Sequence, residues 1–103
     1  MLTATPFGAQ VRRESGRVLC ALSGTLTYDS YPRFRPLLEA VDEDADVVLD
    51  LGDLHFLDSN GLGMLLVLKD RVSGTGRALD LVNVPPRIER VLERTDARVL
   101  LGR

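Results

Sequence analysis

The fold is decided by residues 47–66, which read VVLDLGDLHFLDSNGLGMLL. The first part, 47–51, is an almost continuous apolar run, typical of a central parallel strand that is covered on both faces. The last part has the apolar spacing of a helix, and Asp58, Ser59 and Asn60 stand between the two. A strand, a polar turn and a helix in such short succession predict an α/β fold with a serine hydroxyl at a helix N-terminus.

The segments upstream of this stretch predict a hairpin followed by a helix. Residues 5–13 alternate apolar and polar side chains, and after a glycine-containing turn 17–23 again resembles a strand, so the two should pair antiparallel. A helix should follow Asp29 or Ser30, and Pro36 is expected to break it or delay its start. Its inward-facing side chains are expected to be Phe34, Leu37, Leu38 and Val41.

The segments downstream predict alternating helices and strands. A helix at 59–72 should be followed by a strand near 79–84, a third helix that begins at Pro85-Pro86 and a short last strand at 99–101. The sheet should therefore be mixed and mostly parallel, with one antiparallel N-terminal strand. The side chains expected to face inward from the second helix are Leu62, Leu65, Leu66 and the stem of Lys69; those expected from the third are Ile88, Val91 and Leu92. The core should include Leu22, Phe34, Leu38, Val48, Leu65, Leu81 and Leu92.

Length and composition limit the possible classes of protein. The chain has 103 residues, 45% hydrophobic and 27% charged, as expected for one folded domain spanning 1–103. Its net charge of −2 gives no electrostatic reason to expect nucleic acid binding. The single cysteine, Cys20, is expected to be a small core residue. No leader and no segment able to span a membrane is recognisable, so a cytoplasmic location without membrane insertion is expected.

Catalytic, nucleotide and metal sites are not expected. Ser59 lacks the first glycine of the hydrolase Gly-x-Ser-x-Gly turn, and the only histidine, His55, lies near the end of the same strand. If Leu54 and Phe56 face the core, His55 points the other way. The glycines lack the spacing of nucleotide-binding loops. Three nearby carboxylates could in principle hold a hard cation, although solvated loop residues are the simpler interpretation. They are Asp50, Asp53 and Asp58.

The residues alone leave two interpretations of Ser59 open. Serine is favoured at helix N-caps, so Ser59 could simply accept a hydrogen bond from a free backbone N–H group. Alternatively, its hydroxyl accepts a phosphate, which a helix N-terminus favours electrostatically. Gly61 and Gly63 each cost the helix about 1 kcal/mol relative to alanine, so a compensating contact is expected. Either a partner backbone approaches closely at these glycines or the helix packs tightly on the sheet.

The segment 58–63 resembles the signature of STAS domains, in particular the single-domain anti-sigma factor antagonists of bacterial partner-switching systems. In that family the first serine after the aspartate is the regulatory phosphoserine, which corresponds to Ser59. The resemblance extends over nearly the whole chain, including the first hairpin, whose segment 22–26 stands where the family has a Gly-Glu-Leu-Asp-like turn. Two positions depart from the pattern: Thr27 stands where an acidic residue is frequent, and Asn60 replaces a second serine or threonine.

The resemblance implies a non-enzymatic binding protein without cofactor, metal or small-molecule ligand. The unphosphorylated form would bind an anti-sigma factor that is itself a serine kinase and so release the sigma factor; phosphorylation at Ser59 would inactivate it, and a serine phosphatase would restore it. The loop 25–30 should border Ser59, because loops after neighbouring parallel strands lie along one edge of a sheet. The expected partner-binding residues are Thr27, Tyr28, Ser30, Asp58, Ser59, Asn60, Gly61 and Leu62. The alternative is a constitutive scaffold or accessory subunit of a stress-signalling or lipid-transport complex.

Overall fold

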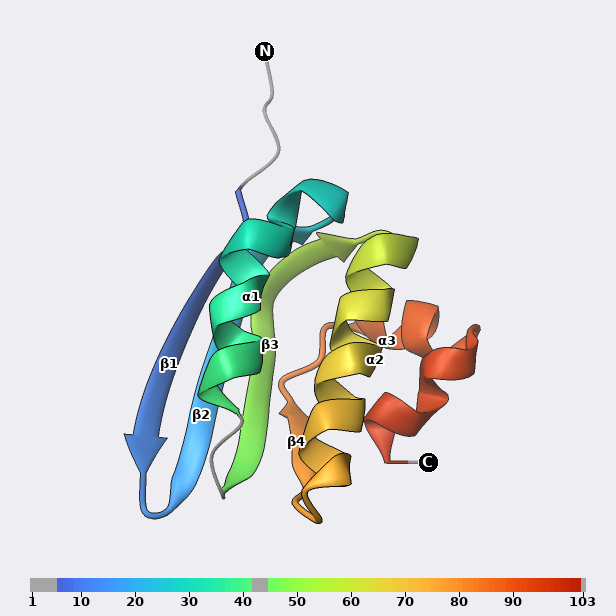
Figure 1. Ribbon diagram of the computed structural model, residues 1–103. Coiled ribbons are helices and arrows are strands. Elements are labelled where there is room, and N and C mark those ends of the chain that lie inside the picture. Colours follow the sequence, from blue (N-terminus) through green and yellow to red (C-terminus); the bar gives the residue numbers. More distant parts are fainter. Residues whose placement is uncertain (1–5, 42–44, 103) are drawn as a thin grey trace.

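The computed structural model describes residues 6–41 and 45–102 of the chain. Strands and helices alternate along these residues after an initial hairpin, as the sequence predicts (Figure 1). The strands are β1 (Gly8–Glu14), β2 (Arg17–Leu26), β3 (Asp46–Leu57) and β4 (Leu79–Val82). The α-helices are α1 (Tyr31–Ala40), α2 (Ser59–Gly74) and α3 (Pro86–Glu93), and two 3₁₀ segments are η1 (Tyr28–Ser30) and η2 (Asp96–Leu101).

The four strands form one mixed sheet in the order β1-β2-β3-β4. β1 pairs with β2 antiparallel through a tight turn in which Ser15 and Gly16 have φ values of 53° and 77°. β2 pairs with β3 and β3 with β4 in parallel. The prediction of a mixed, mostly parallel sheet with one antiparallel N-terminal strand is therefore confirmed.

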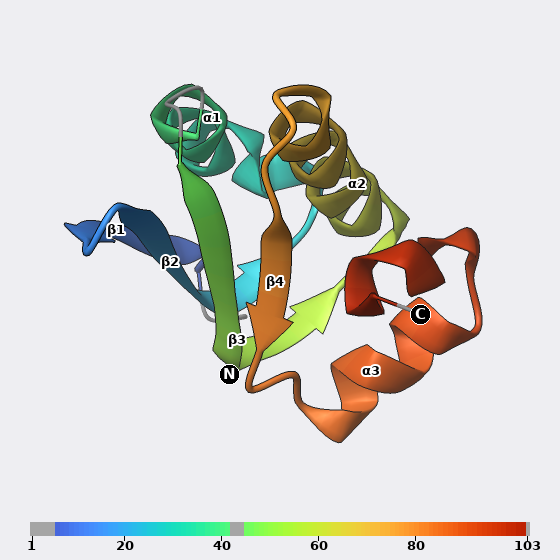
Figure 2. The same ribbon diagram turned by 90° about the horizontal axis from the view of Figure 1, so that it is seen from below.

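The helices α1 and α2 lie side by side on one face of the sheet, and α3 and η2 close the edge beyond β4 (Figure 2). Val47, Leu49 and Leu51 are buried beneath the helices, whereas Val48 and Asp50 on the opposite face are only half-buried. The prediction that this strand is covered on both faces was wrong. An uninterrupted apolar run does not by itself reveal whether helices cover both faces of a sheet.

β3 is longer than predicted and carries two irregularities in its pairing with β2. The register advances from Ala21 and Asp50 to Ser23 and Asp53, and later from Gly24 and Leu54 to Thr25 and Phe56, so β3 contributes one extra residue each time. Each extra residue resets the alternation of inner and outer side chains. Three leucines at a spacing of three residues therefore face the core. Phe56, which was expected to face inward with Leu54, is exposed instead. These leucines are Leu51, Leu54 and Leu57.

α1 runs without a break through Pro36, contrary to the prediction of a broken or delayed helix. The ring of Pro36 is exposed, and the burial of Phe34, Leu37 and Leu38 on the opposite side of the helix compensates for the hydrogen bond that proline cannot donate. The 3₁₀ turn η1 leads directly into α1 at Tyr31.

The buried face of α2 differs from the predicted one. The predicted face was centred on Leu62, Leu65 and Leu66, but Leu62 and Leu66 are only half-buried. The buried residues recur at helical spacing and are Gly61, Leu65, Leu68 and Val72. Leucines surround this helix on several sides, so periodicity alone did not determine its orientation.

The C-terminal segment begins as predicted and ends differently. α3 starts at Pro86 and buries Ile88 and Leu92. The predicted last strand at 99–101 is instead part of the 3₁₀ segment η2, whose first turn is capped by the Thr95 hydroxyl accepting from the Ala97 N–H at 3.3 Å. Of the predicted core, five residues are buried, whereas Val48 and Leu81 are half-buried. The five are Leu22, Phe34, Leu38, Leu65 and Leu92.

Candidate functional site

The N-terminus of α2 is capped by Asp58. One carboxylate oxygen of Asp58, Oδ1, accepts a hydrogen bond from the Gly61 N–H at 2.8 Å, and the Asp58 backbone is extended, as an N-cap requires. Ser59 is the first helical residue and is exposed. The N-cap interpretation of Ser59 is therefore wrong, and its hydroxyl faces the solvent at the positive end of the helix.

Gly61 and Gly63 serve different purposes in the first turns of α2. A Cβ at Gly61 would overlap the carbonyl oxygen of Leu26 and lie 2.9 Å from the carbonyl carbon. The same carbonyl accepts the Asp58 N–H at 3.2 Å, which ties the start of α2 to the end of β2. Tight packing on the sheet thus explains Gly61. A Cβ at Gly63 would meet nothing within 4 Å, so packing within the domain does not explain this glycine.

The loop after β2 borders the start of α2 and is held by Ser30. The buried Ser30 hydroxyl donates to the Thr25 carbonyl and accepts from the Thr27 N–H, both at 3.0 Å. These bonds close the turn and leave Tyr28 at its tip, 73% exposed. Ser30 therefore supports the loop from inside.

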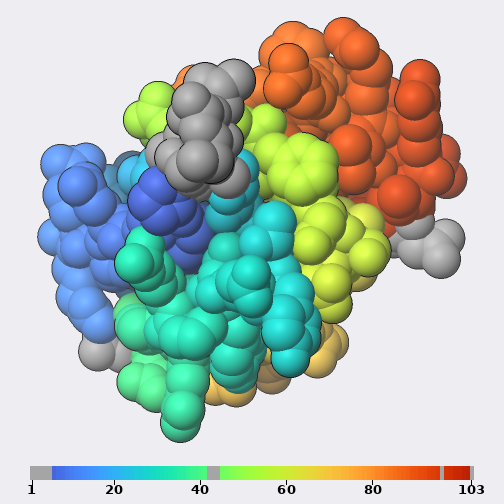
Figure 3. Space-filling view, turned by 90° about the horizontal axis from the view of Figure 1, so that it is seen from above, coloured from blue at the N-terminus to red at the C-terminus, as the bar shows by residue number. Residues whose placement is uncertain are grey.

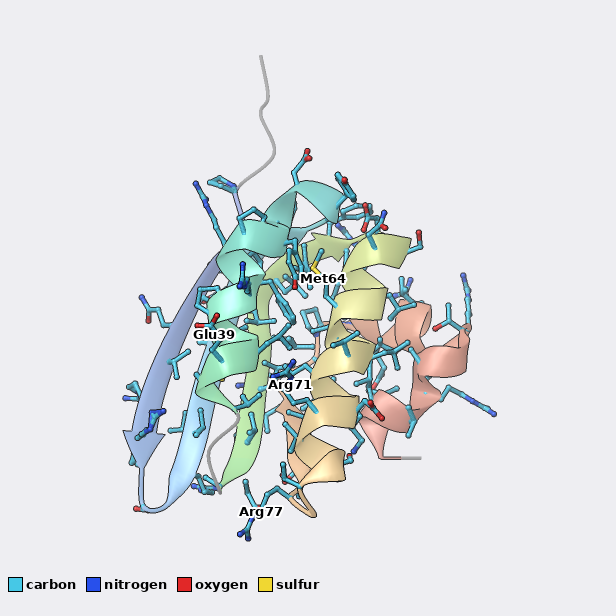
Figure 4. The ribbon with its side chains drawn as sticks, viewed as in Figure 1. Glu39, Met64, Arg71 and Arg77 are labelled. Carbon is cyan, nitrogen blue, oxygen red and sulfur yellow. The ribbon has the colours of Figure 1, made fainter. Side chains whose placement is uncertain are left out.

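An apolar groove of about 690 Å³ opens between η1, α1 and α2, next to Ser59. Figure 4 shows Met64 pointing from α2 toward α1 within it. Among the described residues that line the groove, Asp29 alone is charged. The lining residues are Tyr28, Asp29, Tyr31, Pro32, Phe34, Leu38, Asn60, Gly63, Met64 and Val67. The groove offers an apolar and aromatic surface with a slightly acidic rim.

Exposed large hydrophobic side chains gather at this end of the molecule. Tyr28, Tyr31 and Val67 line the groove, Phe56 precedes the turn into α2, and all four are between 47% and 73% exposed. Figure 3 shows the start of α1 in cyan beside the start of α2 in yellow-green, which together form this end. Clustered exposed apolar groups are typical of protein interaction sites.

The structure assembles the predicted contact residues only in part. Tyr28 and Asn60 both line the groove, and Ser59, which directly precedes Asn60, is not among the lining residues. Thr27, Asp58 and Leu62 are half-buried, and Ser30 and Gly61 are buried. The predicted contact set missed most of the lining residues, among them Tyr31, Met64 and Val67. A usable signal was present, because positions 60, 63, 64 and 67 form a second stripe on α2 beside its buried face.

Two further observations concern the reactive side chains of the described residues. Burial raises the pKa of the Cys20 thiol from 9.0 to about 11, despite the opposing effect of the Arg13 charge. Residues 6–41 and 45–102 contain no cluster of histidine, cysteine and carboxylate side chains suited to a metal ion. Over the same ranges, no helix has both the length and the apolar character needed to cross a membrane.

Comparison with known proteins identifies the family. The sequence matches the STAS domain over residues 9–100. A STAS-domain containing protein of Pseudomonas aeruginosa (strain UCBPP-PA14) is 32% identical over 72 residues, which cover 69% of this chain and 71% of that protein.

Solved structures agree on the fold. An anti-sigma factor antagonist from Mycobacterium paratuberculosis superposes with a TM-score of 0.78 at 23% identity, over 92% of this chain and 82% of that one. The Bacillus cell fate determinant SpoIIAA, in its phosphorylated form, gives a TM-score of 0.70 at 19% identity, over 91% and 88% of the two chains. Since 92 of the 103 residues match the family and the sheet order and helices follow its fold, the chain belongs to the STAS domain family.

Proposed function

We propose that this protein is an anti-sigma factor antagonist that is switched by phosphorylation of Ser59. In the unphosphorylated form it binds an anti-sigma factor with serine kinase activity and so releases a sigma factor. Phosphorylation at Ser59 weakens this complex, and a serine phosphatase restores the active form. The domain acts as a binding protein and as the substrate of these enzymes.

The observation that carries the proposal is the position of Ser59. Asp58 already caps α2, so the Ser59 hydroxyl is exposed and is not needed as the helix cap. It lies beside an apolar groove and exposed aromatic side chains, the kind of surface that a partner protein buries. A kinase can therefore reach the hydroxyl, and we expect a partner that covers the groove to extend to Ser59, which precedes the lining residue Asn60.

The electrostatics favour a switch in binding over a change in folding. A phosphoserine carries about −1.5 to −2 charges at pH 7. The helix N-terminus stabilises such a charge by about 0.3–1 kcal/mol at an exposed site, so the fold tolerates it. At the interface the phosphate would add to the charge of Asp29 on the groove rim. A loss of about 3–4 kcal/mol on burying it would weaken binding by roughly two to three decades.

The comparisons support this proposal by analogy. The Mycobacterium paratuberculosis structure is described as an anti-sigma factor antagonist, and SpoIIAA has been solved in a phosphorylated form. Both are below 25% identity to this chain and share its fold, so the assignment of partner and phosphorylation to this chain is ours. Gly63 adds support, because a glycine that the domain's own packing does not require is explained by close approach of a partner.

Phosphorylation in a lysate of the source organism tests the site. After incubation with ATP, mass spectrometry should find one phosphate per chain, located on Ser59, and Ser59→Ala should abolish it. Ser73→Ala is the matched control, because Ser73 is exposed near the other end of α2, and it should leave the modification unchanged. Phosphate that persists in the Ser59→Ala variant would place the site elsewhere.

Affinity capture distinguishes the switch from the constitutive scaffold. Immobilised wild-type protein and Ser59→Ala should retain the same kinase-containing anti-sigma factor, and Ser59→Asp should lose it. Equal capture of one large assembly by all three proteins would favour an accessory subunit over a phosphorylation switch.

A further inference from the structure

A second hollow, polar in character, is lined by β3 and the start of α3 and shares no lining residue with the groove between α1 and α2. Figure 2 shows α3 on the far side of α2 from α1. Its volume is about 440 Å³. β3 contributes three residues to its lining, and the β4–α3 connection and α3 contribute four. The lining residues are Gly52, Leu54, His55, Pro85, Pro86, Arg87 and Arg90. Ser59 is not among them.

The charge of this hollow is one-sided. Arg87 and Arg90, at an i, i+3 spacing, lie on one side of α3, and His55 lines the same hollow from β3. All three residues are exposed. None of the lining residues is acidic. Among the side chains that the structure describes within residues 6–41 and 45–102, no carboxylate forms an ion pair with Arg87 or Arg90. In a chain with a net charge of −2, such a grouping is not a consequence of composition.

Three carboxylates close in sequence to the lining residues are not themselves part of the lining. Asp50 turns its Oδ1 back to accept the Gly52 N–H at 2.8 Å. Asp53 lies between the lining residues Gly52 and Leu54 in sequence, but it is exposed and is not itself a lining residue. Glu89 on α3 has an interaction of its own and is also not a lining residue. Two guanidinium groups and an imidazole therefore line the same space, and no carboxylate is among its lining residues.

These donors suit a tetrahedral oxyanion. Guanidinium groups bind phosphate through paired N–H donors, and an imidazole adds a donor from another direction. A single carboxylate is satisfied by one guanidinium, whereas a phosphate has enough oxygens for three donors. The volume falls within the range of small-molecule sites, so the hollow has room for more than the phosphate group.

We propose that the hollow lined by His55, Arg87 and Arg90 binds the phosphate group of a small phosphate-bearing molecule. This goes beyond the role of Ser59 and does not depend on it. It also departs from the expectation, drawn from the sequence, that the protein has no small-molecule ligand.

Titration by NMR tests the proposal with inorganic phosphate and, separately, ribose 5-phosphate, with sodium chloride keeping the ionic strength constant. Saturable shifts should centre on the backbone amides of 52–55 and 87–90 and on the His55 ring. The double variant R87Q/R90Q should bind phosphate roughly tenfold more weakly or worse, because each guanidinium contributes charged hydrogen bonds. The control R17Q/R98Q removes the same charge from exposed positions outside the hollow and should change the affinity by less than about twofold.

The two ligands separate the possible sources of the phosphate. Tighter binding of ribose 5-phosphate than of inorganic phosphate would show that the hollow also contacts the sugar of a phosphate ester. Equal binding of the two ligands would show that the hollow recognises the phosphate group alone. Both outcomes support the proposal. Shifts that grow without saturation, or that weaken equally in R17Q/R98Q, would overturn it. Melting curves check folding, and His55→Gln provides a milder second variant that should weaken binding in the same direction.

Discussion

Gly61→Ala is the substitution whose effect follows most directly from the packing of α2. The added Cβ would overlap the Leu26 carbonyl oxygen and lie 2.9 Å from its carbon, and both are backbone atoms that cannot rotate away. Relief requires α2 to move away from the sheet. That movement also strains the hydrogen bond from the Asp58 N–H to the same carbonyl, which is 3.2 Å long.

The magnitude follows from opposing contributions. Overpacking costs about 1–3 kcal/mol, and weakening a backbone hydrogen bond costs about 0.5–1.5 kcal/mol. The gain in helix propensity from glycine to alanine returns about 1 kcal/mol. Gly61→Ala should therefore lower the free energy of unfolding by about 0.5–3.5 kcal/mol, and the middle of that range, about 2 kcal/mol, is equivalent to a drop in Tm of roughly 10 °C for a domain of this size.

Gly63→Ala is the matched control, because the same chemical change two residues later meets nothing within 4 Å. It should raise the free energy of unfolding by about 0.5–1 kcal/mol. Urea unfolding of both variants measures the difference. If Gly61→Ala unfolds at the wild-type midpoint, or if the two variants change stability in the same direction, the separation of a packing glycine from a surface glycine is refuted.

Other predictions concern the cap, the proline and the cysteine. Asp58→Ala should lower the free energy of unfolding by about 1 kcal/mol through loss of the bond to Gly61, and an unchanged urea midpoint would show that the cap is dispensable. Pro36→Ala should raise the free energy of unfolding by about 1–2 kcal/mol by restoring a helical N–H donor. A lower melting temperature of this variant would contradict the prediction and show that proline stabilises α1 through the unfolded state. Because burial raises the pKa of Cys20 to about 11, the folded protein should resist iodoacetamide at pH 8 and react once unfolded, and rapid alkylation of the folded form would contradict the buried position. The contribution of the protonated thiol to stability is present below pH 9 and is lost as the pH rises toward 11.

The sequence was sufficient for the order of the four strands and three α-helices, because local signals agreed with one another. Alternation and a glycine turn defined the hairpin, Pro86 marked the start of α3, and the polar segment after β3 located the start of α2. Each of these signals depends on backbone geometry within a few residues, so no knowledge of distant contacts was needed.

Tertiary contacts decided what the sequence could not. The extra residues in β3 exposed Phe56, and the leucine-rich surface of α2 allowed more than one buried face. The groove also escaped prediction, because Tyr31 and Val67 become neighbours only when α1 and α2 pack side by side. The position of Ser59 at the start of a helix was predictable from its neighbours, whereas the cap role of Asp58 required the geometry.

Binding of the phosphorylated protein tests the central claim most directly. Protein carrying phosphoserine at position 59 and unmodified protein are titrated by calorimetry into the anti-sigma factor kinase that the unmodified protein captures. The account predicts that phosphorylation weakens binding by roughly a hundredfold or more while Tm stays unchanged or rises slightly. Equal affinity of the two forms, with both folded, would contradict the proposal that Ser59 is the switch.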